Sequence, residues 1–274
     1  MTVVVPTRPA ATVVLLRQTP VGFSVFLVQR NRAVGFMPNA WVFPGGRVDA
    51  GDALAGHPRV KGGPQAIERL GLDHGVATAY LVAAARETFE ESGLWLGEGV
   101  VPPEERKALE AREVGLAALL ERHRATLDLD RLVPWSWWVT PDIEPKRFDT
   151  RFLVAVAQDG EARHDDSETV ASAWITPAEA VARAESGELP MAPPTWWTLK
   201  ELAAHSTIEA VLDAATRRPQ RPVQPIVVAT AEGFELRLPG HPEHPEPDVL
   251  GLPPAVRFMQ GRWWADGTRI PSAS

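Results

Sequence analysis

Short apolar runs separated by turn residues open the chain. Residues 11–16 and 23–28 are rich in β-branched, aliphatic and aromatic side chains, and the sequence TPVG lies between them. Two such runs around a turn are typical of a β-hairpin. Similar runs predict strands at 41–43, 133–139, 151–157 and 170–175, and a second hairpin from 226–230 and 234–238.

Longer segments repeat their apolar positions with the 3.6-residue period of a helix. Thr78, Val82, Ala85 and Phe89 fall on one face in this way, so a helix is predicted over 78–92, and Gly93 directly after it is a typical helix stop. A single amphipathic helix is predicted over 104–124. Further helices are expected at 66–70, at 199–204, at 207–216, and after Thr176 as N-cap with Pro177 in the first turn.

Strands and helices of this kind indicate an α/β protein. We expect one domain over residues 1–217, interrupted at about 53–77 by a surface insertion rich in Gly, Pro and charge. The sequence RRPQRPVQP resembles a linker. Residues 218–274 are expected to form a C-terminal extension that packs on the same domain.

Composition and charge narrow the classes of function. The net charge of −7 over 274 residues argues against a binder of nucleic-acid backbones. The absence of cysteine excludes disulfides, thiolate catalysis and cysteine zinc sites. No apolar run reaches about 18 residues and no signal-peptide pattern is present, so we expect neither a membrane span nor secretion, and a cytoplasmic location.

Three glutamates gather on one side of the predicted helix 78–92. Glu87, Glu90 and Glu91 are spaced i, i+3 and i+4, roughly 160° from the apolar face. Like charges this close repel each other, and a bound divalent cation would turn repulsion into ligation. Carboxylates suit Mg²⁺ or Mn²⁺. The alternative is a charged face in solvent.

A glycine loop far upstream changes the balance between these alternatives. The sequence VFPGGRVDAGD and the sequence RETFEESGL together resemble the signature of the Nudix hydrolases. Gly46 and Asp52 match its first half, with Asp in place of Glu, and Arg86 begins its second half, with Thr88 at an aliphatic position. Asp52 and Arg86 are 34 positions apart instead of the eight in the pattern, so 26 residues are inserted.

An interrupted signature is similar to one subgroup of that family, the peroxisomal coenzyme A (CoA) diphosphatases of mammals and their bacterial relatives. The likeness continues through WSWWVTP, KRFDTRF, LPMAPPTWW and PIVVATAEGFELRLPG, and so covers about residues 10–240. The resemblance implies an α/β/α sandwich with a mixed sheet. It also implies metal-dependent hydrolysis of a small-molecule diphosphate.

Site residues follow from the same resemblance. It implies a metal held by the Gly46 carbonyl oxygen and the carboxylates of Glu87, Glu90 and Glu91, with Asp52 at a further ligand position and Arg86 as the orienting residue. A water activated by the cation would attack the diphosphate in line, and a carboxylate would accept its proton. Two candidates for this base stay open, Glu91 and Glu168 of the sequence DDSETVASAW.

Substrate recognition is expected to involve arginines. Counting back along the CoA pattern places Arg30 at a position for phosphate binding, Arg32 is a second candidate, and Arg147 is a third that could equally pair with Asp149. The leading prediction is hydrolysis of CoA or acyl-CoA to 3′,5′-ADP and (acyl-)phosphopantetheine. The alternatives are NADH, ADP-ribose or another nucleoside diphosphate derivative, or a ligand sensor without catalysis.

The position of the insertion between the two halves of the metal motif leads to one further hypothesis, that residues 54–75 form a lid over the site. A homodimer is a further possibility, and the sequence does not decide whether the C-terminal extension closes the site or makes a dimer contact.

Overall fold

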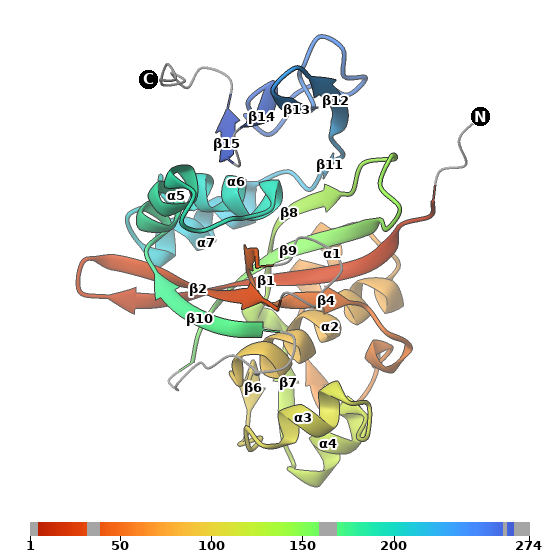
Figure 1. Cartoon of the computed structure of the whole chain (residues 1–274). Coiled ribbons are helices and arrows are strands. Elements are labelled where there is room, and N and C mark those ends of the chain that lie inside the picture. The colour runs from red at the N-terminus through yellow and green to blue at the C-terminus, as the bar shows by residue number, and fades with distance from the viewer. Residues whose placement is uncertain (1–4, 32–38, 159–168, 260–261, 266–274) are drawn as a thin grey trace.

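A mixed β-sheet lies at the centre of the computed structural model, which describes residues 5–31, 39–158, 169–259 and 262–265 (Figure 1). Its main strands follow one another in the order β10 (Thr169–Ile175), β2 (Gly22–Arg30), β1 (Arg8–Thr19), β9 (Phe148–Val156), β8 (Val133–Val139) and β11 (Pro222–Val223). Two short strands complete it, β3 (Trp41–Val42) beside β2 and β4 (Gly45–Arg47) beside β1. β1 is parallel to β9 and β11 is parallel to β8.

The predicted N-terminal hairpin is confirmed. β1 and β2 pair antiparallel, with Leu16 opposite Val25 and Thr19 opposite Gly22 at the turn. The apolar runs are continuous instead of alternating because both faces of these strands are covered. Val13 and Leu15 belong to one core, and Val14 belongs to the other, as the alternation of side chains along a strand requires.

Helices cover both faces of the sheet, so the predicted α/β/α sandwich is confirmed (Figure 1). The first core holds α1 (Pro64–Leu70) and α2 (His74–Ser92) against the sheet. The second core holds α5 (Pro177–Ser186), α6 (Pro193–Leu202) and α7 (Ile208–Arg217). Within the described ranges, no helix combines the length and the apolar character that a membrane crossing requires.

The helix that carries the glutamates, α2, begins one turn earlier than predicted. The side chain of Asp73 accepts hydrogen bonds from the backbone N–H groups of Gly75 and Val76, which caps the helix at its N-terminus. Gly93 ends it in the left-handed conformation, with φ 77°, as the sequence predicted. Thr176 caps α5 through the N–H of Glu179, also as predicted.

The single helix predicted over 104–124 is wrong. Two short helices occupy this segment, α3 (Glu105–Glu110) and α4 (Leu116–Arg122). The chain bends between them at Arg112, whose φ is 60°, and Gly115 lies at the start of α4. Leu109 on α3 and Leu119 on α4 are both buried in the first core.

The insertion between the two halves of the motif is an integral part of the first core. Its strand β5 (Val60–Lys61) pairs with β7 (Thr126–Asp128), which pairs in turn with β6 (Gly97–Glu98). Ala66 and Leu70 on α1 are buried, and the Leu70 carbonyl oxygen accepts a hydrogen bond of 3.2 Å from Arg151. The predicted short helix is confirmed, while the insertion packs as a structural layer.

The C-terminal region forms an antiparallel sheet of its own, in the order β12 (Ile226–Thr230), β13 (Gly233–Arg237), β14 (Ala255–Met259) and β15 (Arg262–Ala265). The predicted second hairpin is therefore confirmed, and the segment predicted as a linker contains β11. The indole N–H of Trp263 donates a 2.8 Å hydrogen bond to the carbonyl of Met191, beside α6. The domain boundary near residue 217 stays a prediction.

Candidate active site

The acidic face of α2 lies directly against the glycine loop. The backbone N–H of Gly45 donates a hydrogen bond of 3.1 Å to Oε2 of Glu91. A Cβ atom on Gly46 would lie only 2.5 Å from Oε1 of Glu87. Backbone and carboxylate can approach this closely only because residue 46 has no side chain.

A polar pocket of about 350 Å³ opens between this loop and the sheet. Glu87 and Glu91 lie on its acidic side, together with Gly45 and Gly46. Three cationic side chains also line it, one from β2, one from β4 and one from the β8–β9 loop: Arg30, Arg47 and Lys146. Carboxylates and cations around one cavity suit a ligand that carries phosphate groups together with a metal ion.

Arg86 is buried beneath this pocket and donates hydrogen bonds to several of the acids around it. It donates from Nε to Oδ1 of Asp52 (2.8 Å) and from Nη2 to Oδ2 of Asp52 (2.9 Å). Burial alone would lower the pKa of Arg86, but its hydrogen bonds to Asp52 and the charges of Glu87, Asp52 and Glu90 outweigh burial and raise it. Asp52 also accepts from the N–H of Asp49 (2.8 Å), so both of its oxygens are engaged. In this structure the Asp52 carboxylate is turned to Arg86, and its place among the metal ligands stays a prediction.

Glu90 has one oxygen that is hydrogen-bonded and one that makes only a long ion-pair contact. Oε2 accepts from Nη1 of Arg86 at 3.0 Å. Oε1 is buried and makes no hydrogen bond among the described residues, and the Arg112 Nη1 atom stands 3.6 Å away. Burial raises the pKa of Glu90 to about 7; Glu87 adds to the increase, while Arg86 and Arg112 oppose it. A buried carboxylate in this state favours an additional positive charge.

These residues fit a hard divalent cation. No group of three His, Asp or Glu side chains is already gathered as a metal cage in the described part of the chain. The donor set is nevertheless of the right chemistry, since Glu87 stands against the Gly46 backbone and Glu90 keeps an unbonded oxygen. Glu87, Glu90, Glu91 and the Gly46 carbonyl would hold the ion; these four assignments stay predictions.

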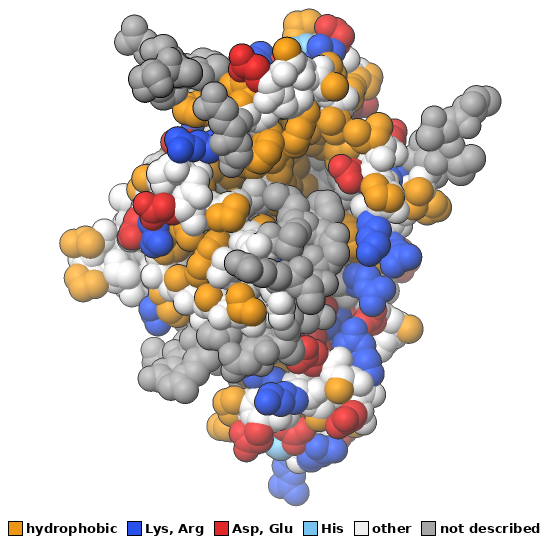
Figure 2. Space-filling model, viewed as in Figure 1, with side chains coloured by type: hydrophobic (Ala, Val, Ile, Leu, Met, Phe, Trp, Pro, Cys, Tyr) orange, Lys and Arg blue, Asp and Glu red, His pale blue; other side chains and the backbone are white. Residues whose placement is uncertain are grey.

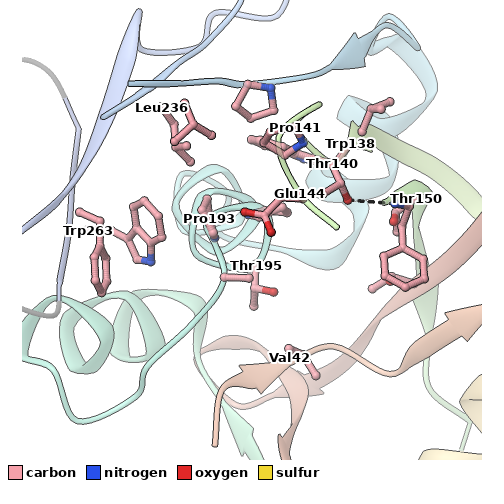
Figure 3. A pocket seen from close by; sticks show the side chains of 18 of the residues that line it. Val42, Trp138, Thr140, Pro141, Glu144, Thr150, Pro193, Thr195, Leu236 and Trp263 are labelled. Atoms are coloured by element: carbon pink, nitrogen blue, oxygen red, sulfur yellow. Dashed lines mark hydrogen bonds between the residues drawn. The ribbon is translucent and has the colours of Figure 1, made fainter. Parts of the chain in front are cut away.

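A larger, mostly apolar cavity of about 700 Å³ adjoins the polar pocket. The two share lining residues: Thr12, Arg30, Val42, Gly45, Phe148 and Thr150. Figure 3 shows its walls, with Leu236 and Trp263 reaching in from the C-terminal sheet, Pro193 and Thr195 from the start of α6, and Val42 from β3. None of the described lining residues belongs to the insertion 53–77, and the same is true of the polar pocket, so these two cavities give no support to the lid hypothesis, which stays a prediction.

The three predicted substrate arginines have different outcomes. Arg30 lines both cavities, at their junction. Arg32 lies outside the described residues, as does the candidate base Glu168. Arg147 is buried and donates to the carbonyls of Val5 (2.7 Å), Thr140 (3.1 Å) and Pro141 (3.2 Å).

The described contacts of Arg147 are all to the protein, and its role in binding phosphate stays a prediction. Its ionic partner is Asp142, at 2.6 Å, and the alternative partner Asp149 instead accepts from the indole of Trp137 at 2.7 Å. The sequence analysis did not select two other cations of the polar pocket, Lys146, which precedes Arg147, and Arg47, which follows Gly46. Both stand inside motifs that the sequence had already singled out, and that adjacency was the available signal.

Comparison with known proteins places this geometry in a family. A family model described as the NUDT19 Nudix domain matches residues 68–202. The human protein named acyl-coenzyme A diphosphatase NUDT19 is 30% identical over 269 residues, which cover 80% of this chain and 72% of the human protein. This chain belongs to the NUDT19 family of Nudix hydrolases.

Two further relatives agree with this family membership. The chicken (Gallus gallus) protein with the name acyl-coenzyme A diphosphatase NUDT19 is 29% identical in an alignment 287 residues long, gaps included, that covers 85% of this chain and 76% of that protein. The crystal structure of a NUDIX hydrolase from Alicyclobacillus acidocaldarius is 32% identical, with a TM-score of 0.68, and the match covers 79% of this chain and 99% of that one. The resemblance predicted from the split motif is confirmed.

Proposed function

We propose that this NUDT19-family chain is a metal-dependent diphosphatase that hydrolyses the diphosphate bond of CoA or acyl-CoA, giving 3′,5′-ADP and (acyl-)phosphopantetheine. The observation that carries this proposal is the joining of an acidic and cationic pocket to a mostly apolar cavity through shared residues. A CoA ester has the matching parts, a highly charged nucleotide diphosphate and an uncharged arm. The relatives named acyl-coenzyme A diphosphatase support the same substrate class.

Mg²⁺ or Mn²⁺ is the proposed cofactor, held by Glu87, Glu90, Glu91 and the Gly46 carbonyl. When bound, such an ion neutralises charge on a diphosphate and lowers the pKa of a coordinated water. Asp52 positions the proposed ligands indirectly. It fixes Arg86, which in turn donates hydrogen bonds to Glu87 (2.8 Å) and Glu90 (3.0 Å).

The cationic side chains bind and orient the substrate. Arg30 stands where the two cavities join and is suited to the diphosphate itself, since a guanidinium binds phosphate oxygens at two points. Arg47 and Lys146 line the polar pocket only, and are suited to the remaining phosphate of the nucleotide.

Glu91 is the proposed acceptor of the proton from the attacking water. It lines the polar pocket, and the Gly45 N–H fixes its Oε2 atom at 3.1 Å. A carboxylate that is oriented by a backbone donor needs no rearrangement to accept a proton. Glu168 stays the alternative base predicted from the sequence.

Hydrolysis of a substrate panel tests this function. CoA, acetyl-CoA, a long-chain acyl-CoA, NADH and ADP-ribose are incubated with Mg²⁺ or Mn²⁺, and the products are resolved by chromatography. We expect 3′,5′-ADP from the CoA compounds, and loss of at least about 100-fold in kcat in Glu91→Gln. Turnover of NADH or ADP-ribose alone would contradict the CoA proposal, and ligand binding without any turnover would contradict catalysis.

Cytoplasmic location and a homodimer stay predictions from the sequence. Cell fractionation tests the first and size-exclusion chromatography with light scattering tests the second.

A further inference from the structure

The C-terminal sheet forms one wall of the apolar cavity. The residues of this wall lie outside the split motif with the proposed metal ligands. Val227 and Ala229 on β12, Phe234 and Leu236 on β13, Phe258 on β14 and Trp263 on β15 all line it. The opposite wall comes from Pro193 and Thr195 at the start of α6 (Figure 3). The cavity is therefore built where the C-terminal sheet meets the rest of the chain.

The C-terminal sheet has one apolar face and one charged face, as the alternation of side chains along a strand dictates. Phe234, Phe258 and Trp263 stand opposite one another across three strands and make ring contacts of 4.8–5.5 Å between centroids on the cavity side. Glu235 and Arg257, one residue along each strand, form an ion pair of 2.8 Å on the other side. The aromatic row is thus turned toward the cavity.

The charged residues that line each cavity indicate which part of the substrate binds there. Among the described lining residues of the apolar cavity, the charged ones are Arg30, at the junction with the polar pocket, and Glu144. A nucleotide with a 3′-phosphate would bring at least one further negative charge, and would leave it without a cation there. The polar pocket offers Arg47 and Lys146 for that charge.

Resting on the proposed function, we propose that the cavity under the C-terminal sheet binds the pantetheine and acyl arm of the substrate, and that this sheet sets the preference for acyl chains. The diphosphate then lies between Arg30 and the acids of α2, with the adenosine 3′-phosphate toward Arg47 and Lys146. A volume of about 700 Å³ is in the range of small-molecule sites, and its aromatic row provides apolar surface for methylene groups. Figure 2 shows apolar side chains gathered in a hollow beneath these strands.

Two substitutions on β12 separate the cavity face from the outer face. Ala229 is exposed at the open edge of the cavity, opposite Phe234, so Ala229→Trp adds bulk beside the aromatic row. Thr230 is exposed and lies outside the cavity lining, so Thr230→Trp adds the same bulk to the other side of the same strand. Ala229→Asp is the second test variant, because it adds a charge to the cavity with little bulk. Thermal unfolding confirms that each variant is folded.

The experiment compares kcat/KM for a long-chain acyl-CoA with that for CoA, in the intact protein with Mg²⁺. We expect Ala229→Trp and Ala229→Asp to lower the acyl-CoA to CoA ratio by about tenfold or more, and Thr230→Trp to leave it unchanged. Calorimetric titration of both ligands into the Glu91→Gln background gives the same comparison without turnover.

An equal decrease for both substrates in the Ala229 variants would overturn the assignment of the acyl chain to this cavity, since only a part common to both substrates, the pantetheine or the adenosine, would then lie there. No change for either substrate would overturn it as well, because the cavity would then be outside the site. Failure of the wild-type protein to cut or bind any CoA compound is a different result, and contradicts the proposed function itself.

Discussion

Arg86 and Asp52 lie 34 residues apart in the chain, yet they form a two-point ion pair in the protein interior. The side chains keep only 4% and 1% of their exposure. Arg86 also donates to the carbonyl of Arg47 at 2.8 Å, next to the glycines. One buried guanidinium therefore joins both halves of the split motif, and the residues between them can be extended without separating the glycine loop from the acids.

The first prediction concerns this pair. Asp52→Ala leaves the Arg86 guanidinium buried without its main partner, so we expect the free energy of unfolding to fall by about 3–5 kcal/mol, with or without Mg²⁺. Urea unfolding in EDTA measures it. Arg183→Gln is the control, because it removes an exposed ion pair with Glu188 and should cost less than about 1 kcal/mol. A loss seen only with metal present would instead support Asp52 as a ligand.

The second prediction concerns the pH dependence that Glu90 introduces. Its pKa of about 7 in the folded protein lies above the value of about 4.3 for an unfolded chain, so the folded state binds the proton more tightly. This contribution to stability is fully present below about pH 4 and is lost as the pH rises through 7. We expect the metal-free melting temperature to fall between pH 5 and 8, and to fall less in Glu90→Gln.

Mg²⁺ should reverse the trend, because ligation requires the deprotonated carboxylate. The increase in melting temperature on adding Mg²⁺ should grow from pH 6 to pH 8 in the wild-type protein. In Glu90→Gln the increase should be smaller than in the wild-type protein. An identical Mg²⁺ response in both proteins would remove Glu90 from the ligand set.

The third prediction concerns the insertion as a structural layer. Leu70→Ala creates a cavity in the first core, since this side chain is only 3% exposed, and should lower the free energy of unfolding by about 2–5 kcal/mol while KM stays unchanged. Gln65→Ala, exposed on the same helix, is the control. Deletion of residues 54–75 should prevent folding. A folded deletion variant with altered KM would support the lid hypothesis.

The fourth prediction separates the two arginines that the sequence treated alike. Arg30→Gln should raise KM for CoA by about tenfold or more, since it removes a charge-assisted contact to phosphate, with little change in stability. Arg147→Gln should lower the stability and leave KM for CoA almost unchanged, because its guanidinium donates hydrogen bonds to the carbonyls of Val5, Thr140 and Pro141. Steady-state kinetics and thermal unfolding of both variants decide it. Equal KM values for Arg30→Gln and the wild-type protein would place Arg30 outside the site.

The sequence by itself determined the elements whose signal is local. The hairpin of β1 and β2, the helix that presents Glu87, Glu90 and Glu91, its stop at Gly93 and the cap at Thr176 all depend on neighbouring residues, and all were predictable. The bend at Arg112 was not, because the apolar period continues through it and gives no local signal for a break.

Tertiary structure decided what the charged side chains do. Asp52 and Glu87 are both acids of the motif and both contact Arg86, yet the fold places only Glu87 in the lining of the polar pocket. The apolar cavity depends on strands from both ends of the chain, which no local pattern brings together. Residue spacing fixes periodicity and caps over a few residues, whereas burial, ion-pair partners and cavities are set by contacts between segments that are distant along the chain.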